Sequence, residues 1–260
     1  MTSCGAWSQR SEGSGCLFER EHHRRVAQVL EALDATLLES SACYFGGGTA
    51  ITLLHGEYRE SVDVDLLVSD VGGYRALRQR LSGRGGIRNI LRPNVELTQV
   101  REVRADQYGV RTLLAVRDVE VKFEIVLEGR VQLEAPGPVD RICGVATLTT
   151  LDMATSKLLA NSDRFADDSV HSRDLIDLAM LDLDKPTLRR AIDKASGAYG
   201  ASVERDLKKA IDALKNRRGR LDACMRALQM SSVPPGLTPV VPAVLWQKIR
   251  RLAPRARGPA

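Results

Sequence analysis

The sequence predicts an α/β domain followed by a set of packed helices. Two runs rich in β-branched residues, 110–116 and 119–126, predict neighbouring strands. Before them, residues 43–68 combine a short apolar segment, a glycine run, a short apolar helix and an alternating strand. Beyond Pro136 and Pro138, the apolar residues recur at helical spacing. A sheet-bearing half therefore precedes a helical half.

Composition divides the chain into four segments. Residues 1–19 are rich in Ser and Gly, and we expect them to be poorly ordered. Residues 20–135 form the predicted sheet domain, and residues 140–230 form the helical domain. Residues 231–260 are rich in proline and basic residues, and we expect an extended or loosely docked tail.

Helical spacing predicts a first helix over residues 21–40, with an apolar stripe that includes Val26 and Leu30. The adjacent His22 and His23 cannot share a helix face as ligands, and we expect both to face solvent.

Further elements follow the acidic strand. Residues 74–81 predict a helix that ends at the glycines of 83–86, residues 95–127 predict a β meander, and residues 185–230 predict three helices. Arginines cluster near the glycine-rich loop. These arginines are Arg78, Arg80, Arg84, Arg88 and Arg92. They could bind an anion, or they could simply form a solvated basic loop.

Composition favours an anionic partner and no membrane. Of the 260 residues, 43% are hydrophobic and 27% charged, as in globular proteins. The net charge of +5 and the pI near 9.1 favour nucleic acid as a partner, whereas 4% aromatics argue against extensive base stacking. No apolar run resembles a signal peptide or a membrane span, so we expect a cytoplasmic protein. The cysteines lack zinc-site spacing, and we expect reduced thiols.

An acidic pair lies on the strand that follows the glycine run. Asp63 and Asp65 are two residues apart, so both side chains point to the same face of a strand. Their Cβ atoms would lie roughly 6–7 Å apart. Such a pair suits Mg²⁺ or Mn²⁺, because a hard cation is typically held by one or two carboxylates plus substrate phosphates. Taken alone, the pair also fits a solvated strand edge.

The glycine run supplies a complementary feature, which we call the phosphate cradle: Gly46, Gly47, Gly48 and Thr49. Glycines let backbone N–H groups approach a phosphate, and the start of the following helix adds partial positive charge. The glycines alone equally fit a plain turn. Together with the acidic strand, they predict a site for a metal ion and a nucleotide.

This combination resembles the first motif of the DNA-polymerase-β-like nucleotidyltransferases. The glycine run followed by Arg59-x-Ser61-x-Asp63-x-Asp65 is similar, in detail, to the AbiEii-type nucleotidyltransferase toxin family. The resemblance implies a mixed sheet with flanking helices and a helical C-terminal domain. It also implies that Arg59 and Ser61 contribute to nucleotide binding.

The same resemblance implies a third carboxylate on a strand beside the acidic one. Glu124 matches that position and would be a metal ligand or a catalytic base. The alternative is a Lys122–Glu124 pair on a solvated sheet face.

Two later stretches also resemble this family: Lys157-Leu-Leu-Ala-x-x-x-Arg164 and Arg173-Asp174-x-x-Asp177-Leu. The resemblance places Lys157 near the nucleotide phosphates as a catalytic residue. It places Asp174 and Asp177 in support of the nucleotide site. A surface ion-pair network is the plain alternative for the second stretch.

The resemblance implies transfer of a nucleoside monophosphate from a nucleoside triphosphate to an acceptor hydroxyl. It implies a cognate antitoxin as partner and, as in some members of the family, tRNA 3′ ends as acceptors. One alternative is a nucleotidyltransferase for small antibiotic-type molecules, which would favour an acidic pocket over basic charge. Another is a non-catalytic nucleotide- or antitoxin-binding module, against which the intact acidic pair argues.

Overall fold

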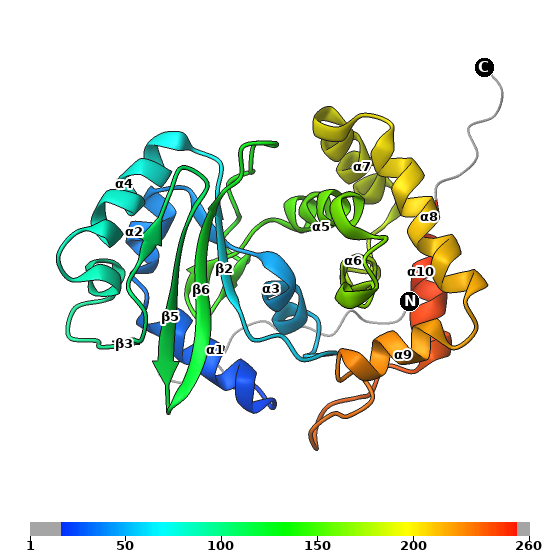
Figure 1. Ribbon diagram of the computed structural model, residues 1–260, viewed down its shortest axis with the longest axis horizontal. Helices are drawn as coiled ribbons and strands as arrows, with labels where there is room; N and C mark the ends of the chain where they lie inside the picture. The colour runs from blue at the N-terminus through cyan, green and yellow to red at the C-terminus, as the bar shows by residue number, and fades with distance from the viewer. Residues whose placement is uncertain (1–16, 254–260) are drawn as a thin grey trace.

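The structure, a computed structural model, describes residues 17–253 (Figure 1). Within these residues, six strands form one mixed sheet in which β2 and β6 run parallel and the other pairs antiparallel. The mixed sheet implied by the family resemblance is confirmed. The strands are β1 (Cys43–Phe45), β2 (Val64–Val68), β6 (Val119–Leu127), β5 (Gly109–Val116) and β3 (Thr98–Gln99) in spatial order, with β4 (Arg104–Ala105) also paired to β5.

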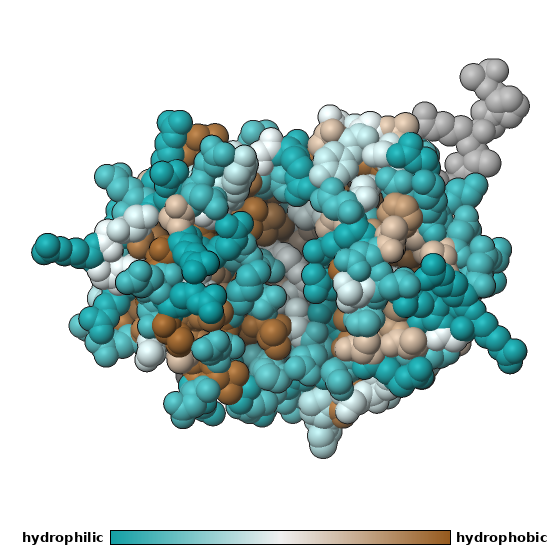
Figure 2. Space-filling model, viewed as in Figure 1, coloured by the Kyte–Doolittle hydropathy of each residue, from teal (hydrophilic) through white to brown (hydrophobic). Residues whose placement is uncertain are grey.

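Helix α3 lies between the sheet and the helical half. Helices α2 (Ala35–Ser40) and α4 (Val71–Ser82) lie on one side of the sheet (Figure 1). On the other side, α3 (Gly47–Leu54) packs against β2 and also against α5 (Thr150–Arg164) and α6 (Arg173–Met180). Figure 2 shows the molecular surface hollowed between the two halves. A short η1 helix (Gly86–Ile90) follows α4.

The predicted helix over residues 21–40 is two helices, α1 (Glu21–Ala32) and α2. The chain breaks because Asp34 is extended and its side chain accepts the N–H of Leu37 at 3.0 Å, which caps α2. The expectation for His23 is wrong. It is fully buried because it lies at helical spacing from Val26 and Leu30 on the apolar stripe.

The predicted three helices over residues 185–230 are confirmed as α7 (Lys185–Tyr199), α8 (Ser202–Asn216) and α9 (Arg220–Ala227). The tail departs from the prediction. Its α10 (Pro242–Arg251) packs against α6 and α9 because Leu245 and Ile249 lie on one face and are fully buried. A hairpin of β7 (Arg141–Ile142) and β8 (Val145–Ala146), together with η2 (Asp168–Val170), completes the connections.

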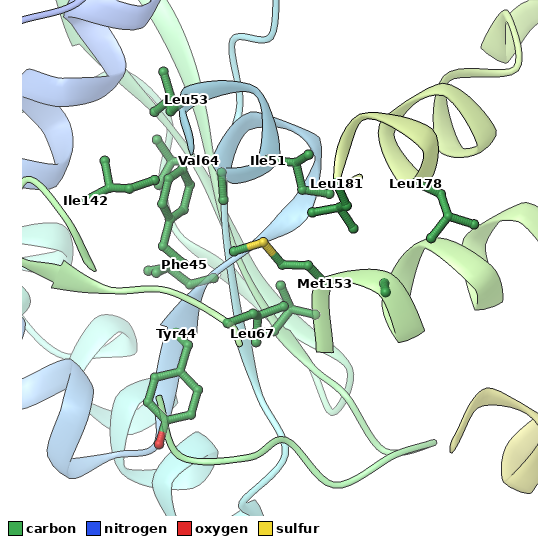
Figure 3. Packing of buried hydrophobic residues seen from close by; sticks show 14 of the residues in the cluster. Tyr44, Phe45, Ile51, Leu53, Val64, Leu67, Ile142, Met153, Leu178 and Leu181 are labelled. Carbon is green, nitrogen blue, oxygen red and sulfur yellow. The ribbon is translucent and has the colours of Figure 1, made fainter. Parts of the chain in front are cut away.

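One apolar cluster runs through both halves. Figure 3 shows Phe45 and Val64 on the sheet side, Ile51 of α3 in the middle, and Met153 and Leu181 on the helical side. Full burial of such a side chain contributes roughly 1.5–3 kcal/mol. The shared cluster therefore holds α3, and the glycine run at its start, against both halves.

Among residues 17–253, Cys43 and Cys224 are buried free thiols, whereas Cys143 is disulfide-bonded. The expectation of reduced thiols is wrong at Cys143. No helix in this part of the chain is long and apolar enough to cross a membrane. Most of the segment predicted to be poorly ordered, residues 1–16 of 1–19, lies outside the described residues.

Candidate active site

Asp63 and Asp65 lie at the start of β2 on the sheet face next to α3. Val64 and Leu66 alternate with them and are fully buried in the core. Within the described chain, neither carboxylate accepts a hydrogen bond or joins an ion pair. Burial raises the pKa of Asp65, and the neighbouring charge of Asp63 raises it further. The pair therefore offers an external cation two carboxylates that have no protein partner.

Glu124 lies beside Asp65, because the two residues are register partners in the parallel β2–β6 pair. Lys122 Nζ is 2.6 Å from Glu124 Oε2, and Arg111 Nε donates to Glu124 Oε1. Burial alone would raise the pKa of Glu124, but these two cations hold it below its usual value. The Lys122–Glu124 pair of the alternative is present, but Glu124 is buried and does not lie on a solvated face. Unlike Asp65, Glu124 already has protein partners.

The phosphate cradle packs directly on the acidic strand. Gly46 donates its N–H to the Asp65 carbonyl oxygen at 2.8 Å. A Cβ at Gly47 would lie 2.6 Å from Asp65 Oδ2, and the φ of +69° also favours glycine there. Because α3 begins at Gly47, its first-turn N–H groups have no helical acceptor. The partial positive charge of this helix end therefore lies beside Asp65.

Gly48 packs on a buried ion-pair network behind the cradle. A Cβ at Gly48 would collide with the Arg59 guanidinium group. Arg59 donates from Nε and Nη2 to the two oxygens of Asp177 at 2.7 and 2.9 Å. Tyr58 donates its hydroxyl to Asp177 at 2.6 Å, and Lys157 Nζ lies 2.7 Å from it. The three contacts from Tyr58 and Arg59 hold α6 against the segment that leads into β2, and the contact from Lys157 holds α6 against α5.

Asp174 extends this network along α5 and α6. Lys157 Nζ lies 3.0 Å from Asp174 Oδ1, and Arg164 donates to both Asp174 oxygens at 2.7 and 2.9 Å. Burial alone would raise the pKa of Asp174 and of Asp177, but the adjacent cations hold both below the usual value. Three cations, Arg59, Lys157 and Arg164, face two carboxylates, so the network carries one net positive charge.

The alternative of a surface network at Arg173, Asp174 and Asp177 is wrong. Both aspartates are buried, at 2% and 0% exposed, and their partners come from α5 and from the segment before β2. A network out of solvent fixes geometry more tightly than exposed pairs do, because removing one partner leaves a buried charge.

A chain of hydrogen bonds links α1 to the cradle. Thr49 Oγ1 lies 2.8 Å from Ser61 Oγ, and the Ser61 N–H donates to His23 Nε2 at 3.3 Å. His23 Nδ1 lies 2.7 Å from Glu57 Oε2. Thr49 and Ser61 are residues that the sequence predicts for the site, whereas His23 and Glu57 are not. The helical spacing of His23 with Val26 was the available signal for its burial.

One protein family matches most of the chain. Its profile, described as "Nucleotidyl transferase AbiEii toxin, Type IV TA system", matches residues 28–245. The chain belongs to this family. A crystal structure of a candidate nucleotidyltransferase from H. pylori is similar at 17% identity and a TM-score of 0.47, over 89% of this chain and 93% of that one. No curated protein matches.

This AbiEii-family chain brings its predicted site residues together in two groups. The first comprises the cradle, Asp63, Asp65 and Glu124 around the start of α3 and the β2–β6 pair. The second comprises Arg59, Lys157, Asp174 and Asp177 in the buried network. Ser61 connects the cradle to α1.

The donor set suits a divalent cation at Asp63 and Asp65. Among the residues described, no group of three or more His, Cys, Asp or Glu side chains is arranged as a metal site. Two carboxylates without protein partners nevertheless match the way Mg²⁺ is usually held, with substrate phosphates supplying further oxygens. A cation here would also offset the repulsion that raises the pKa of Asp65.

Proposed function

We propose that this chain transfers a nucleoside monophosphate from a nucleoside triphosphate to a hydroxyl group of an acceptor RNA. The observation that carries the proposal is the unpartnered Asp63–Asp65 pair beside the positive end of α3. This arrangement places a cation site at the start of β2 next to a phosphate site in the first turn of α3. Membership of a nucleotidyl transferase family supports the same reaction class.

In this proposal the triphosphate lies between the cradle and the acidic pair. The N–H groups of Gly47, Gly48 and Thr49 donate to phosphate oxygens. The net positive charge of the buried network, which includes Lys157, favours the anionic substrate from behind α3. Mg²⁺ or Mn²⁺, held by Asp63 and Asp65 with Glu124 as third ligand, would neutralise phosphate charge and acidify the acceptor hydroxyl.

The transfer is a single displacement at phosphorus. The acceptor oxygen forms a bond to the α-phosphorus, the bond from that phosphorus to the bridging oxygen breaks, and pyrophosphate leaves. The hydroxyl proton passes to Glu124 where that carboxylate acts as the base, and otherwise to solvent water. Arg59 and Ser61 hold the strand and cradle in position. Positioning and electrostatics supply most of the catalysis.

We propose the 3′ end of tRNA as the acceptor and a cognate antitoxin as the protein partner in the cytoplasm. The net charge of +5 favours an anionic acceptor over a cationic antibiotic. Exposed arginines follow α4 and would contact phosphates: Arg84, Arg88 and Arg92. Membership of a type IV toxin–antitoxin family supports the antitoxin.

Labelling experiments test the reaction. The purified protein is incubated with total RNA and each labelled triphosphate in Mg²⁺, and a hydroxylated antibiotic is supplied in parallel. We expect label in small RNA, with a loss of about 10² or more in Asp63→Asn and Asp65→Asn, the scale on which an electrostatic stabiliser contributes. Label in the antibiotic alone would favour the small-molecule alternative. Full activity in folded Asp65→Asn would end the proposal.

A further inference from the structure

His23 is a buried titratable group outside the two groups of predicted site residues. It lies on α1 at 0% exposure, and both ring nitrogens have partners. Because the Ser61 backbone N–H can only donate, Nε2 accepts and carries no proton. The proton therefore lies on Nδ1, which donates to Glu57 Oε2 at 2.7 Å. The ring is neutral, in agreement with burial, which lowers the pKa of His23.

Glu57 is itself held in one orientation. Its two carboxylate oxygens accept the N–H groups of Glu19 and Arg20 at 2.8 and 2.9 Å. Arg20 Nε donates back to the Glu57 carbonyl oxygen at 3.0 Å. Glu57 also has a φ of +51°, which a residue other than glycine adopts only when its surroundings hold it there. The His23 ring therefore rests on a rigid support.

We propose that His23 is a positioning residue for the acidic strand and the cradle. Ser61 precedes Asp63 by two residues, so its N–H contact with His23 fixes the backbone roughly 6–7 Å from the residue that bears the carboxylate. The Ser61 hydroxyl in turn contacts Thr49 in the first turn of α3. One ring thus sets the spacing between the proposed cation and phosphate sites, and the inference rests on the function proposed for them.

The contact requires the neutral ring. A second proton on Nε2 would set two N–H donors against each other and separate Ser61 from His23. The charged groups around the ring come from three places: Glu57 favours the protonated ring, whereas Arg20 and Arg59 oppose it. Burial opposes it most. The positioning contact is therefore expected to hold at neutral pH and to be lost on acidification.

Two substitutions separate the two contacts of the ring. His23→Gln places an amide oxygen near the position of Nε2, where it can still accept from Ser61. His23→Asn keeps a donor for Glu57 but is too short to reach Ser61. We expect His23→Gln to keep Mn²⁺ affinity and kcat within about threefold of wild type. We expect His23→Asn to lose about tenfold or more in each, as changes to residues that orient metal ligands do.

The decisive readouts need no transfer activity. They are Mn²⁺ binding by electron paramagnetic resonance and exchange of the Ser61 amide by NMR, with thermal stability as control. Slow Ser61 exchange in wild type and His23→Gln, and fast exchange in His23→Asn, support the inference. Equal losses in both variants overturn it. If neither variant folds, ¹⁵N shifts of the wild-type ring decide, and a proton on Nε2 overturns it. Absence of transfer by wild type counts against the proposed function alone.

Discussion

Asp65 and Asp177 are both aspartates with little solvent contact near the start of α3, yet their pKa values move in opposite directions. Asp177 accepts from Tyr58, Arg59 and Lys157, and these partners outweigh the cost of burial. Burial and the charge of Asp63 raise the pKa of Asp65, which has no hydrogen-bonding partner in the described chain.

The difference separates a closed site from an open one. The chain supplies its own counterions at Asp174 and Asp177, where the carboxylates hold α5, α6 and the segment before β2 together. It supplies none in hydrogen-bonding contact with Asp63 and Asp65, where the proposed cation would come from outside the chain. The same residue type thus has a structural role at Asp177 and a proposed metal-binding role at Asp65.

The largest effect on stability is expected from a substitution at Asp177. Asp177→Asn leaves Arg59 and Lys157 without a full counterion in a buried site, and we expect a loss of roughly 3–5 kcal/mol in the free energy of unfolding. Urea denaturation measures it. Asp222→Asn, at an exposed position without an ion pair in the described residues, is the control and should stay within about 0.5 kcal/mol. Similar values for both variants would show that the network contributes little.

The same network should make the free energy of unfolding depend on pH in the acidic range. The pKa of Asp174 and of Asp177 is lowered by folding, so their contribution is complete above the unfolded value of about 4 and is lost as pH falls through the folded values. We expect the free energy of unfolding to fall steeply below about pH 4. In Asp177→Asn the fall should be shallower. An equal slope in the two proteins would assign the acid sensitivity to other carboxylates.

Asp65 should give the smallest effect and the opposite sign. Its raised pKa means that the ionised form opposes folding. Asp65→Asn should therefore raise the free energy of unfolding by about 1 kcal/mol or less in the absence of divalent cations, and raise the melting temperature accordingly. Differential scanning fluorimetry in a chelator measures this. A clear destabilisation would mean that the carboxylate has a structural partner after all.

The open site was the more predictable of the two from sequence. Period-two alternation places Asp63 and Asp65 on one face whatever surrounds the strand, and the glycines precede a helix within a few residues. The closed site depends on contacts such as Arg59 with Asp177, which are 118 residues apart in sequence. Motif resemblance selected these residues, but only the fold shows that they pair with each other.

Two errors have local causes. Adjacency to His22 does not decide the exposure of His23, because position 23 belongs to the apolar stripe of α1. Prolines after residue 231 predict an extended tail. Pro242 instead occupies the first turn of α10, where a missing N–H costs nothing.

Mn²⁺ binding tests the central contrast most directly. Electron paramagnetic resonance would follow titration of wild type, Asp65→Asn and Asp222→Asn in the presence of a non-hydrolysable triphosphate. We expect wild type and Asp222→Asn to bind with the same affinity, and Asp65→Asn to bind at least tenfold more weakly, the scale of losses at metal sites. Equal Mn²⁺ affinity in all three folded proteins would contradict the assignment of the open carboxylates to a cation.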